Sequence, residues 1–422
     1  MRVDPMSAGR SDDRGSEVSR RAFLSAGTRL AFAAGAMPLA SGGAQAAWAA
    51  GRNRTSRGAP SFVGTDHVGI MVPNIEEAID WFRDVMGASA PLTFGPFSDP
   101  TGNLMHELVD VDRRAVIPQI TQLRVGHSAN IELLEYKAPH QDRRLPTNSD
   151  FGGHHIAFYV RDIDKAVRYM ESRRVEKLLG PFPITSGPAA GQTINYFRTP
   201  FGLFIEFISY PHGEAYQRPG ISPLWSPKLN GLDSVETRVP GLLGIDHFGF
   251  TVPNVDEAAR WFEEVLGFTN PLTWGPFGDP TGTLMHELLD VNRHAIIEKV
   301  RMVRGGAGAN VEMFQWRAPD QDRTFPKNSD YGGHHIAFYV RDINEAVKYM
   351  ESRKVDKLLG PFAITSGPAA GQTINYFHPP FGTFIEFINY PHGMAYQKTA
   401  RVLLWNPQNN RHVRVQRTRT GA

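Results

Sequence analysis

The feature that most constrains the fold of this 422-residue chain is a long internal repeat. The run Gly152–Val160 (GGHHIAFYV) returns unchanged at Gly332–Val340, and His67 returns as His247 with the same offset of 180 residues (247 − 67). Roughly 100 of the 160 positions from 61 to 220 are identical to their partners, without a gap. A repeat of this length indicates a duplicated domain rather than a solenoid unit, so one fold has to serve both halves.

Each half is also double inside. The segment 66–74 resembles the segment 154–162, because each reads as a strand that ends at an N-cap residue, Asn74 or Asp162, before an amphipathic helix. Three strand-like runs follow each helix. These runs lie at about 103–111, 115–124 and 129–137 in the first unit, and at about 177–183, 192–198 and 202–209 in the second. The sequence therefore predicts an α+β fold made of four β-α-β-β-β units.

The N-terminus has the features of an export signal. Residues 19–24 (SRRAFL) match the twin-arginine signal, a weakly apolar segment follows at 22–40, and residues 44–46 (AQA) form a small-residue cleavage site. The apolar segment is too short and too rich in small residues for stable membrane insertion. We therefore expect residues 1–46 to be a signal peptide that contacts the twin-arginine export machinery transiently. The mature protein would be periplasmic or otherwise extracytoplasmic.

Composition excludes several kinds of site and partner. The chain has no cysteine, which rules out disulfides, thiolate catalysis and cysteine-ligated metals. Hydrophobic content of 41% and charged content of 21% are typical of a soluble globular protein. The net charge is +2, and residues 1–46 alone carry +2 (six Arg against three Asp and one Glu), so the mature protein is near neutral. Nucleic acid is therefore not expected as a partner.

Strand alternation assigns one histidine of each unit to a cavity. In the first strand, Val68 and Ile70 face the helix, whereas His67 faces the opposite, concave side. The same alternation in the next unit makes His155, rather than His154, the partner of His67. A small residue two places after each such histidine leaves room beside the ring. These small residues are Gly69, Ala157, Gly249 and Ala337.

The last strand of each unit carries a carboxylate inside an apolar run, which is costly unless the charge is paired or bound to a metal. Glu135 is a weaker candidate than Glu132, because the repeat replaces it with Gln315 but keeps Glu312. Imidazole and carboxylate together suit Zn, Ni, Co, Mn or Fe(II), so we expect one divalent metal per domain. The predicted metal ligands are His67, Glu132, His155, Glu206, His247, Glu312, His335 and Glu386.

These motifs resemble those of the vicinal oxygen chelate superfamily, which includes glyoxalases, extradiol dioxygenases and bleomycin-resistance proteins. The resemblance rests on the strand-one motifs at His67 and His155, on the closing run Pro200–Phe207 (PFGLFIEF), and on the carboxylate strand Asn130–Leu134 (NIELL). It implies that two units pair into a half-open barrel that cups one metal. The similarity covers about residues 62–215 and 242–395.

The resemblance implies two glyoxalase-like half-open barrel domains. The expected divisions are a signal peptide at 1–46, a flexible leader at 47–61, a first domain at 62–227 with units 62–140 and 150–215, a linker at 228–241, a second domain at 242–407 with units 242–320 and 330–395, and a basic tail at 408–422. Pairing of neighbouring units is the simpler case, and would place His67, Glu132, His155 and Glu206 in one site and the other four ligands in a second. Pairing of unit one with unit four, and of unit two with unit three, stays open.

The resemblance implies a metal-dependent isomerase or lyase that acts on a small oxygen-bearing organic molecule, with the metal as Lewis acid. The candidate catalytic residues for proton transfer are Glu132, Glu206, Glu312 and Glu386. One alternative is an Fe(II) extradiol-like ring-cleaving dioxygenase, and a second is a non-catalytic small-molecule binding or resistance protein. Recurring polar residues that would line a pocket, or else serve turns and packing, are His106, Gln192, Tyr196, Tyr210 and their partners His286, Gln372, Tyr376 and Tyr390.

The two halves differ most in their first units. About 40 of 80 positions are identical between the first units, against about 62 of 80 between the second units. We therefore expect the first units to distinguish two sites that differ in substrate or in occupancy.

Overall fold

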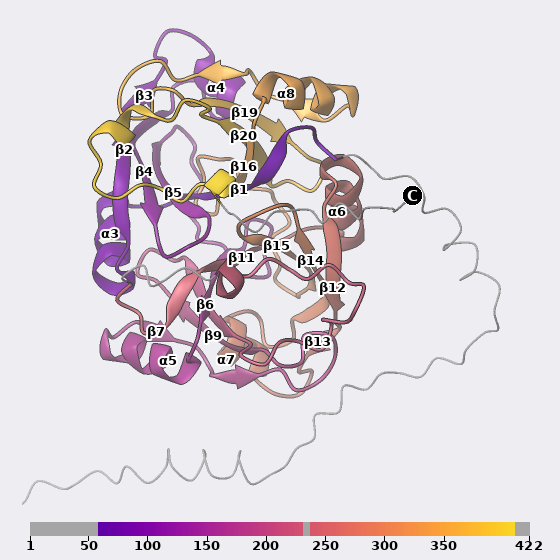
Figure 1. Cartoon of the computed structure of the whole chain (residues 1–422). Helices are drawn as coiled ribbons and strands as arrows, with labels where there is room; N and C mark the ends of the chain where they lie inside the picture. Colours follow the sequence, from indigo (N-terminus) through magenta and orange to yellow (C-terminus); the bar gives the residue numbers. More distant parts are fainter. Residues whose placement is uncertain (1–57, 231–236, 410–422) are drawn as a thin grey trace, which may run out of the picture. The chain divides into compact units, whose positions relative to one another are not determined.

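The computed structural model describes residues 58–230 and 237–409, which contain all four repeat units (Figure 1). The predicted signal peptide lies outside the described residues, as does all but the start of the basic tail. The export route and the location of the protein therefore stay predictions. None of the helices in the described ranges is long and apolar enough to cross a membrane.

The strands form two ten-stranded sheets. The strands of the first sheet are β1 (Phe62–Met71), β2 (Ser89–Phe94), β3 (Phe97–Ser98), β4 (Val116–Arg124), β5 (Asn130–Lys137), β16 (His334–Val340), β17 (Asp356–Lys357), β18 (Phe362–Ala363), β19 (Thr373–His378) and β20 (Phe384–Asn389). The strands of the second sheet are β6 (His154–Val160), β7 (Glu176–Lys177), β8 (Phe182–Pro183), β9 (Thr193–Arg198), β10 (Phe204–Ser209), β11 (Leu242–Thr251), β12 (Thr269–Trp274), β13 (Phe277–Gly278), β14 (Ile296–Arg304) and β15 (Asn310–Arg317). The predicted α+β fold is confirmed.

Each sheet joins two units that the simpler pairing would place in different domains. In the first sheet, β1 of unit one runs antiparallel to β16 of unit four, and the order is β17-β19-β20-β16-β1-β5-β4-β2. In the second sheet, β6 of unit two runs antiparallel to β11 of unit three. The contiguous blocks 62–227 and 242–407 therefore do not correspond to the sheets. This corrects the expected grouping and selects the pairing of unit one with four and of two with three.

The helices begin where the sequence predicts. The Asn74 side chain accepts a hydrogen bond from the backbone N–H of Glu77, and the Asp162 side chain accepts one from the backbone N–H of Lys165. In Figure 1, α3 and α5 lie on one side of the described fold, and α6 and α8 lie on the other. The helical elements are α3 (Ile75–Trp81), the π-helical turn η1 (Phe82–Met86), α4 (Leu104–Val109), α5 (Ile163–Ser172), η2 (Pro227–Asn230), α6 (Val255–Trp261), the π-helical turn η3 (Phe262–Leu266), α7 (Leu284–Leu289), α8 (Ile343–Ser352), η4 (Ala395–Lys398) and η5 (Pro407–Asn409).

The predicted strand at 103–111 is wrong, because this segment contains α4. Met105, Leu108 and Val109 are buried and have helical spacing, which places them on one face. The Asp99 side chain accepts hydrogen bonds from the backbone N–H groups of Gly102 and Leu104, which fixes the entry to the helix. The missing strand of the unit is instead β2, and the run predicted at 177–183 divides into the short strands β7 and β8.

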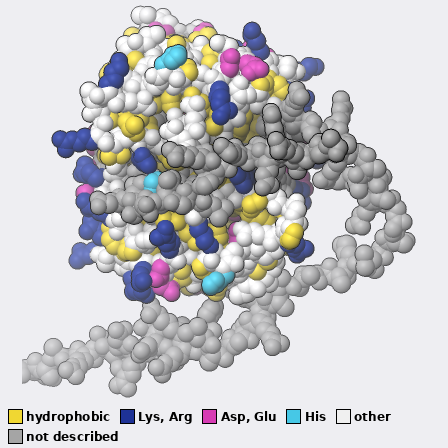
Figure 2. All heavy atoms as spheres, viewed as in Figure 1, with side chains coloured by type: hydrophobic (Ala, Val, Ile, Leu, Met, Phe, Trp, Pro, Cys, Tyr) yellow, Lys and Arg dark blue, Asp and Glu magenta, His cyan; other side chains and the backbone are white. Residues whose placement is uncertain are grey.

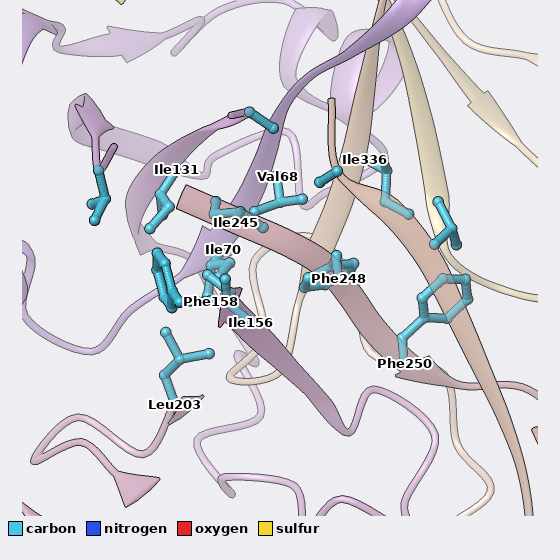
Figure 3. Packing of buried hydrophobic residues seen from close by; sticks show 14 of the residues in the cluster. Val68, Ile70, Ile131, Ile156, Phe158, Leu203, Ile245, Phe248, Phe250 and Ile336 are labelled. Carbon is cyan, nitrogen blue, oxygen red and sulfur yellow. The ribbon is translucent and has the colours of Figure 1, made fainter. Parts of the chain in front are cut away.

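One apolar core connects the two sheets. Val68 of β1, Ile156 of β6, Phe248 of β11 and Ile336 of β16 belong to the same cluster of buried side chains (Figure 3). Ile75 at the start of α3 belongs to it as well, so the predicted helix-facing side of the first strand is confirmed. The opposite face of these strands is left for polar side chains.

The surface is of mixed character. On the face visible in Figure 2, the Lys and Arg side chains of the described residues are interspersed with acidic, apolar and neutral groups. The absence of a nucleic-acid partner was expected from net charge, and stays a prediction.

Two histidines meet where the sheets adjoin. The rings of His154 on β6 and His334 on β16 lie 4.9 Å apart between centroids, and both side chains are buried. Nδ1 of His154 lies 2.8 Å from the carbonyl oxygen of Gly152, an arrangement in which the ring donates to the carbonyl. Burial lowers the pKa of His154 to about 4 and that of His334 to about 3. These two histidines are therefore neutral packing residues.

The variant His154→Gln should lose less stability in acid than the wild-type protein. The unfolded chain binds a proton at this imidazole below about pH 6.5, whereas the folded protein keeps the ring neutral down to a pKa of about 4. Wild-type stability therefore falls as the pH drops below about 6.5, and the substitution should reduce the fall between pH 6.5 and pH 4.5 by about 2 kcal/mol. Urea unfolding of chelator-treated protein at pH 6.5 and pH 4.5 measures this difference. His106→Gln, at an exposed helix position, is the control, and an equal fall in wild type and His154→Gln would contradict the assignment.

Candidate metal centres

The structure brings all eight predicted ligands together, in two buried clusters. The first centre consists of His67, Glu132, His335 and Glu386. The second centre consists of His155, Glu206, His247 and Glu312. Each centre takes one His and one Glu from each of two units, so the eight predicted residues converge, but not in the sequential halves of the simpler pairing. The cause is the pairing of β1 with β16 and of β6 with β11.

Strand register makes the four side chains of each centre converge. In the first centre, Gly69 on β1 lies opposite His335 on β16 and beside Glu132 on β5. Ala337 on β16 lies opposite His67. The ring of His335 occupies the space above Gly69, where an added Cβ would lie 1.8 Å from the ring atom Cε1. The predicted room beside the ring therefore exists, but it accommodates the histidine of the opposing unit.

The donor atoms are spaced as a small cation requires. In the first centre, the Nε2 atoms of His67 and His335 lie 3.2–3.7 Å from the Oε2 atoms of Glu132 and Glu386, and 3.3 Å from each other. Ligands about 2.1 Å from a tetrahedral cation lie about 3.4 Å apart. With neutral imidazoles the centre carries two negative charges, which balance one divalent ion. The chemistry and spacing of the donors therefore fit such an ion.

The second centre has the same geometry. The Nε2 atoms of His155 and His247 lie 3.1–3.5 Å from the Oε2 atoms of Glu206 and Glu312. The two Nε2 atoms are again 3.3 Å apart. The duplicated sequence has therefore produced two equivalent donor sets.

Mutual attraction keeps the carboxylates ionised although they are buried. Burial alone would raise the pKa of Glu386, but hydrogen bonds from His335 and His67 outweigh it and lower the pKa to about 2. The same balance lowers the pKa of Glu206 to about 2. Burial alone would lower the pKa of His67, but Glu132, Asp66 and Glu386 raise it well above the usual value. A divalent cation would replace the protons that these histidines otherwise hold.

A carboxylate behind the first histidine orients it. Asp66 Oδ1 lies 2.9 Å from Nδ1 of His67, and the hydroxyl of Tyr390 donates to the other Asp66 oxygen. Asp246, His247 and Tyr210 repeat this arrangement. Such a partner fixes the ring so that Nε2 faces the centre. The sequence carried a signal for it, an Asp before His67 and His247 in both halves, but its role was not recognised.

A tyrosine adjoins each centre. The hydroxyl of Tyr196 donates to Glu206 Oε2 at 2.9 Å and lies 3.5 Å from Nε2 of His155. The hydroxyl of Tyr376 lies 3.4 Å from Nε2 of His335. Burial raises the pKa of both tyrosines well above its ordinary value, so they stay protonated donors. These two recurring tyrosines therefore lie at the centres. The sequence analysis had left open whether they line a pocket or serve turns and packing.

Other recurring histidines lie away from both centres. His106 on α4 and His286 on α7 have exposed side chains, and their Nδ1 atoms are within 4 Å of Asp110 and Asp290, respectively, on the same helical turn. The structure therefore gives them no part in either centre.

Two polar residues near the centres were missed by the sequence analysis. The side-chain amide of Gln122 donates to Glu132 Oε1 at 2.9 Å, and Met302 holds this position in the other half. Glu214 is buried and accepts a hydrogen bond from Gln192, and Met394 replaces it in the other half. Burial raises the pKa of Glu214 to about 7. Neither residue recurs at the 180-residue offset, so the repeat could not reveal them.

Known proteins resemble the chain in sequence and fold. The family model of the glyoxalase/bleomycin resistance protein/dioxygenase superfamily matches residues 66–196 and 246–376. A 2-epi-5-epi-valiolone epimerase from Actinomyces sp is 40% identical over 175 residues, which are 41% of this chain and 94% of that protein. Among solved structures, glyoxalase I from Zea mays is 13% identical with a TM-score of 0.47, covering 78% of this chain and 92% of that one. A Mn(II)-bound glyoxalase from Novosphingobium aromaticivorans is 16% identical with a TM-score of 0.26, covering 82% and 87%.

The variant Gly69→Ala should weaken metal binding at the first centre only. The new methyl group would displace the ring of His335, and loss of a ligand's position should reduce affinity at least about tenfold. Gly249→Ala should do the same at the second centre, because a Cβ there would lie 2.0 Å from Cε1 of His155. Calorimetric titration of metal-free protein with Zn(II) should show one weakened site in each variant and two in the double variant.

Each glycine variant serves as the control for the other, and circular dichroism checks that the fold is retained. Gly69 and His335 come from opposite halves of the chain, so this experiment also tests the pairing of units. Wild-type affinity at both sites in both single variants would contradict the geometry.

Proposed function

The chain belongs to the glyoxalase/bleomycin resistance protein/dioxygenase superfamily, and from this premise we propose that it is a metal-dependent isomerase with two centres. The observation that carries the proposal is the pair of buried clusters, each with two His and two Glu whose donor atoms lie within 4.8 Å of one another. The 40% identity to a protein named as an epimerase supports an isomerase in particular. Its substrate would be a small organic molecule with neighbouring oxygens.

The residues present suit a divalent cation with nitrogen and oxygen ligands, namely Zn, Ni, Co, Mn or Fe(II). In the first centre, His67, Glu132, His335 and Glu386 would hold it, and the equivalent four residues would do so in the second. When bound, the cation would polarise a carbonyl oxygen as a Lewis acid and stabilise negative charge on an enolate. The buried setting excludes bulk water, which strengthens every charge interaction in the centre.

The two glutamates of a centre are placed to move a proton. Glu132 on β5 and Glu386 on β20 come from strands on opposite sides of the β1–β16 pair. Epimerisation beside a carbonyl requires a base to remove a proton from one side of the carbon and an acid to return one to the other side. We propose that the paired carboxylates serve these two roles. In the second centre Glu312 is freer than Glu206, because Tyr196 donates a hydrogen bond to Glu206, whereas Glu312 contacts His155 and His247.

The main alternative is a ring-cleaving dioxygenase that uses Fe(II). That chemistry uses two His and one carboxylate and keeps positions open for oxygen and substrate. The second glutamate of each centre fits this scheme less well than it fits proton transfer. Oxygen uptake with a catechol in the presence of Fe(II) would favour the dioxygenase.

The metal-loaded protein should exchange the proton beside the carbonyl of 2-hydroxycyclohexanone for deuterium in heavy water. The double variant Glu132→Gln with Glu312→Gln removes one base from each centre, and should reduce the exchange rate at least about 100-fold. Nuclear magnetic resonance of the ketone measures the rate, and chelation of the metal should abolish it. Metal analysis confirms that both centres of the variant are still loaded.

The matched control is Glu135→Gln. Glu135 lies on the same strand as Glu132, but its carboxylate accepts a hydrogen bond from the backbone N–H of Ile75 outside the centre. Gln315 occupies the equivalent place and accepts the equivalent bond from Val255, so the fold tolerates this change. Exchange that is insensitive both to the double variant and to chelation would overturn the proposal.

A further inference from the structure

The two centres share their ligands but differ in the groups that surround them. Beside Glu132 of the first centre stands Gln122, whereas Met302 occupies that place beside Glu312 of the second. At a loop position the difference is reversed, because Met394 on the first-centre side corresponds to Glu214 on the second-centre side. Chemically different substrates are therefore expected to fit the two centres.

The amide oxygen of Gln122 is buried beside the first centre and has no partner among the described residues. The carboxylate of Glu132 can only accept, so the NH₂ group of Gln122 has to face it and the orientation of the amide is fixed. The side chain is 1% exposed, and its Oε1 atom has no hydrogen-bond partner among the described residues. A buried acceptor left unpaired costs free energy, so this atom calls for a donor from a bound molecule.

A second unpaired amide oxygen lies on the first-centre side. Gln372 is 4% exposed, and its Oε1 atom also has no partner among the described residues. The NH₂ group of its repeat partner Gln192 donates to Glu214, an acceptor that Met394 does not replace. Met394 packs in one buried cluster with Ala337, the residue opposite His67, which places this loop beside the first centre.

At the strand position beside its glutamate, the second centre offers an apolar wall. Met302 packs in one buried cluster with Leu272, Leu224 and Tyr216, and the NH₂ group of Gln192 donates to Glu214. A hydroxyl group that would donate to Gln122 in the first centre finds no equivalent acceptor at Met302 in the second. A substrate hydroxyl directed there would lose its hydrogen bonds to water without replacement.

We propose that the first centre selects a polyhydroxylated ketone whose hydroxyl groups donate to Gln122 and Gln372, and that the second centre selects a less hydroxylated ketone. This inference rests on the proposed isomerase function and adds the substrate class of each centre. Gln122 and Met302 are the specificity-determining pair. The two copies of the repeat have therefore diverged beside their centres, as expected if each centre binds a different substrate.

The test compares two probes, a pentahydroxycyclohexanone and 2-hydroxycyclohexanone, binding to metal-loaded protein by calorimetry. Wild-type protein should bind the pentahydroxy ketone more tightly at one centre. Gln122→Met should lower this preference roughly tenfold, because one hydrogen bond is lost. Met302→Gln should instead create a second site with such a preference, a gain that misfolding cannot produce.

The matched control is Gln119→Met on the same strand. Its side chain donates to the hydroxyl of Thr121, away from the centre, so the preference should be unchanged. Wild-type protein that binds the pentahydroxy ketone no better than 2-hydroxycyclohexanone overturns the proposal, as does an unchanged preference in both Gln122→Met and Met302→Gln. Deuterium exchange by the wild-type protein is read in parallel. Exchange without discrimination refutes only the substrate assignment, whereas absence of exchange with both ketones refutes the isomerase function itself.

Discussion

The antiparallel pairing of β1 with β16, and of β6 with β11, is the constraint on which the rest of the structure depends. Each pair sets a glycine against a histidine and an alanine against the other histidine, as with Gly69 opposite His335 and Ala337 opposite His67. The outer parallel strands then bring in one glutamate from each side. Since the paired strands come from opposite halves of the chain, neither half alone contains a complete centre.

The centres are possible only because opposite charges compensate each other out of water. Transfer of a carboxylate from water to a protein interior costs several kcal/mol per ion, and each centre contains two. Histidine protons or a divalent cation supply the compensating charge, and Asp66 and Asp246 add a second layer that orients His67 and His247. Metal loading would therefore stabilise both sheets. The apolar core lies on the other face of the central strands and adds no charge to the centres.

Much of the fold, and the residues that form the two clusters, followed from the sequence, because strand alternation has a period of two and the repeat marks each position twice. Alternation placed His155, rather than His154, on the cavity side of its strand, and the repeat favoured Glu132 over Glu135. The pairing could not follow, because β6 and β16 have the same sequence, HHIAFYV, and β1 cannot distinguish them by side-chain contacts. The helix α4 was taken for a strand because its apolar run is short. Gln122 and Glu214 were not predicted, because neither residue recurs at the equivalent position of the other copy.

The most direct test of this account is anomalous diffraction from crystals of the protein that carry its native metal. The account predicts two ions per chain, one at each centre, and each held by residues from opposite halves. In the first centre the ligands would be His67, Glu132, His335 and Glu386. An ion bound by His67 together with His155, or no anomalous peak at either cluster, would contradict it.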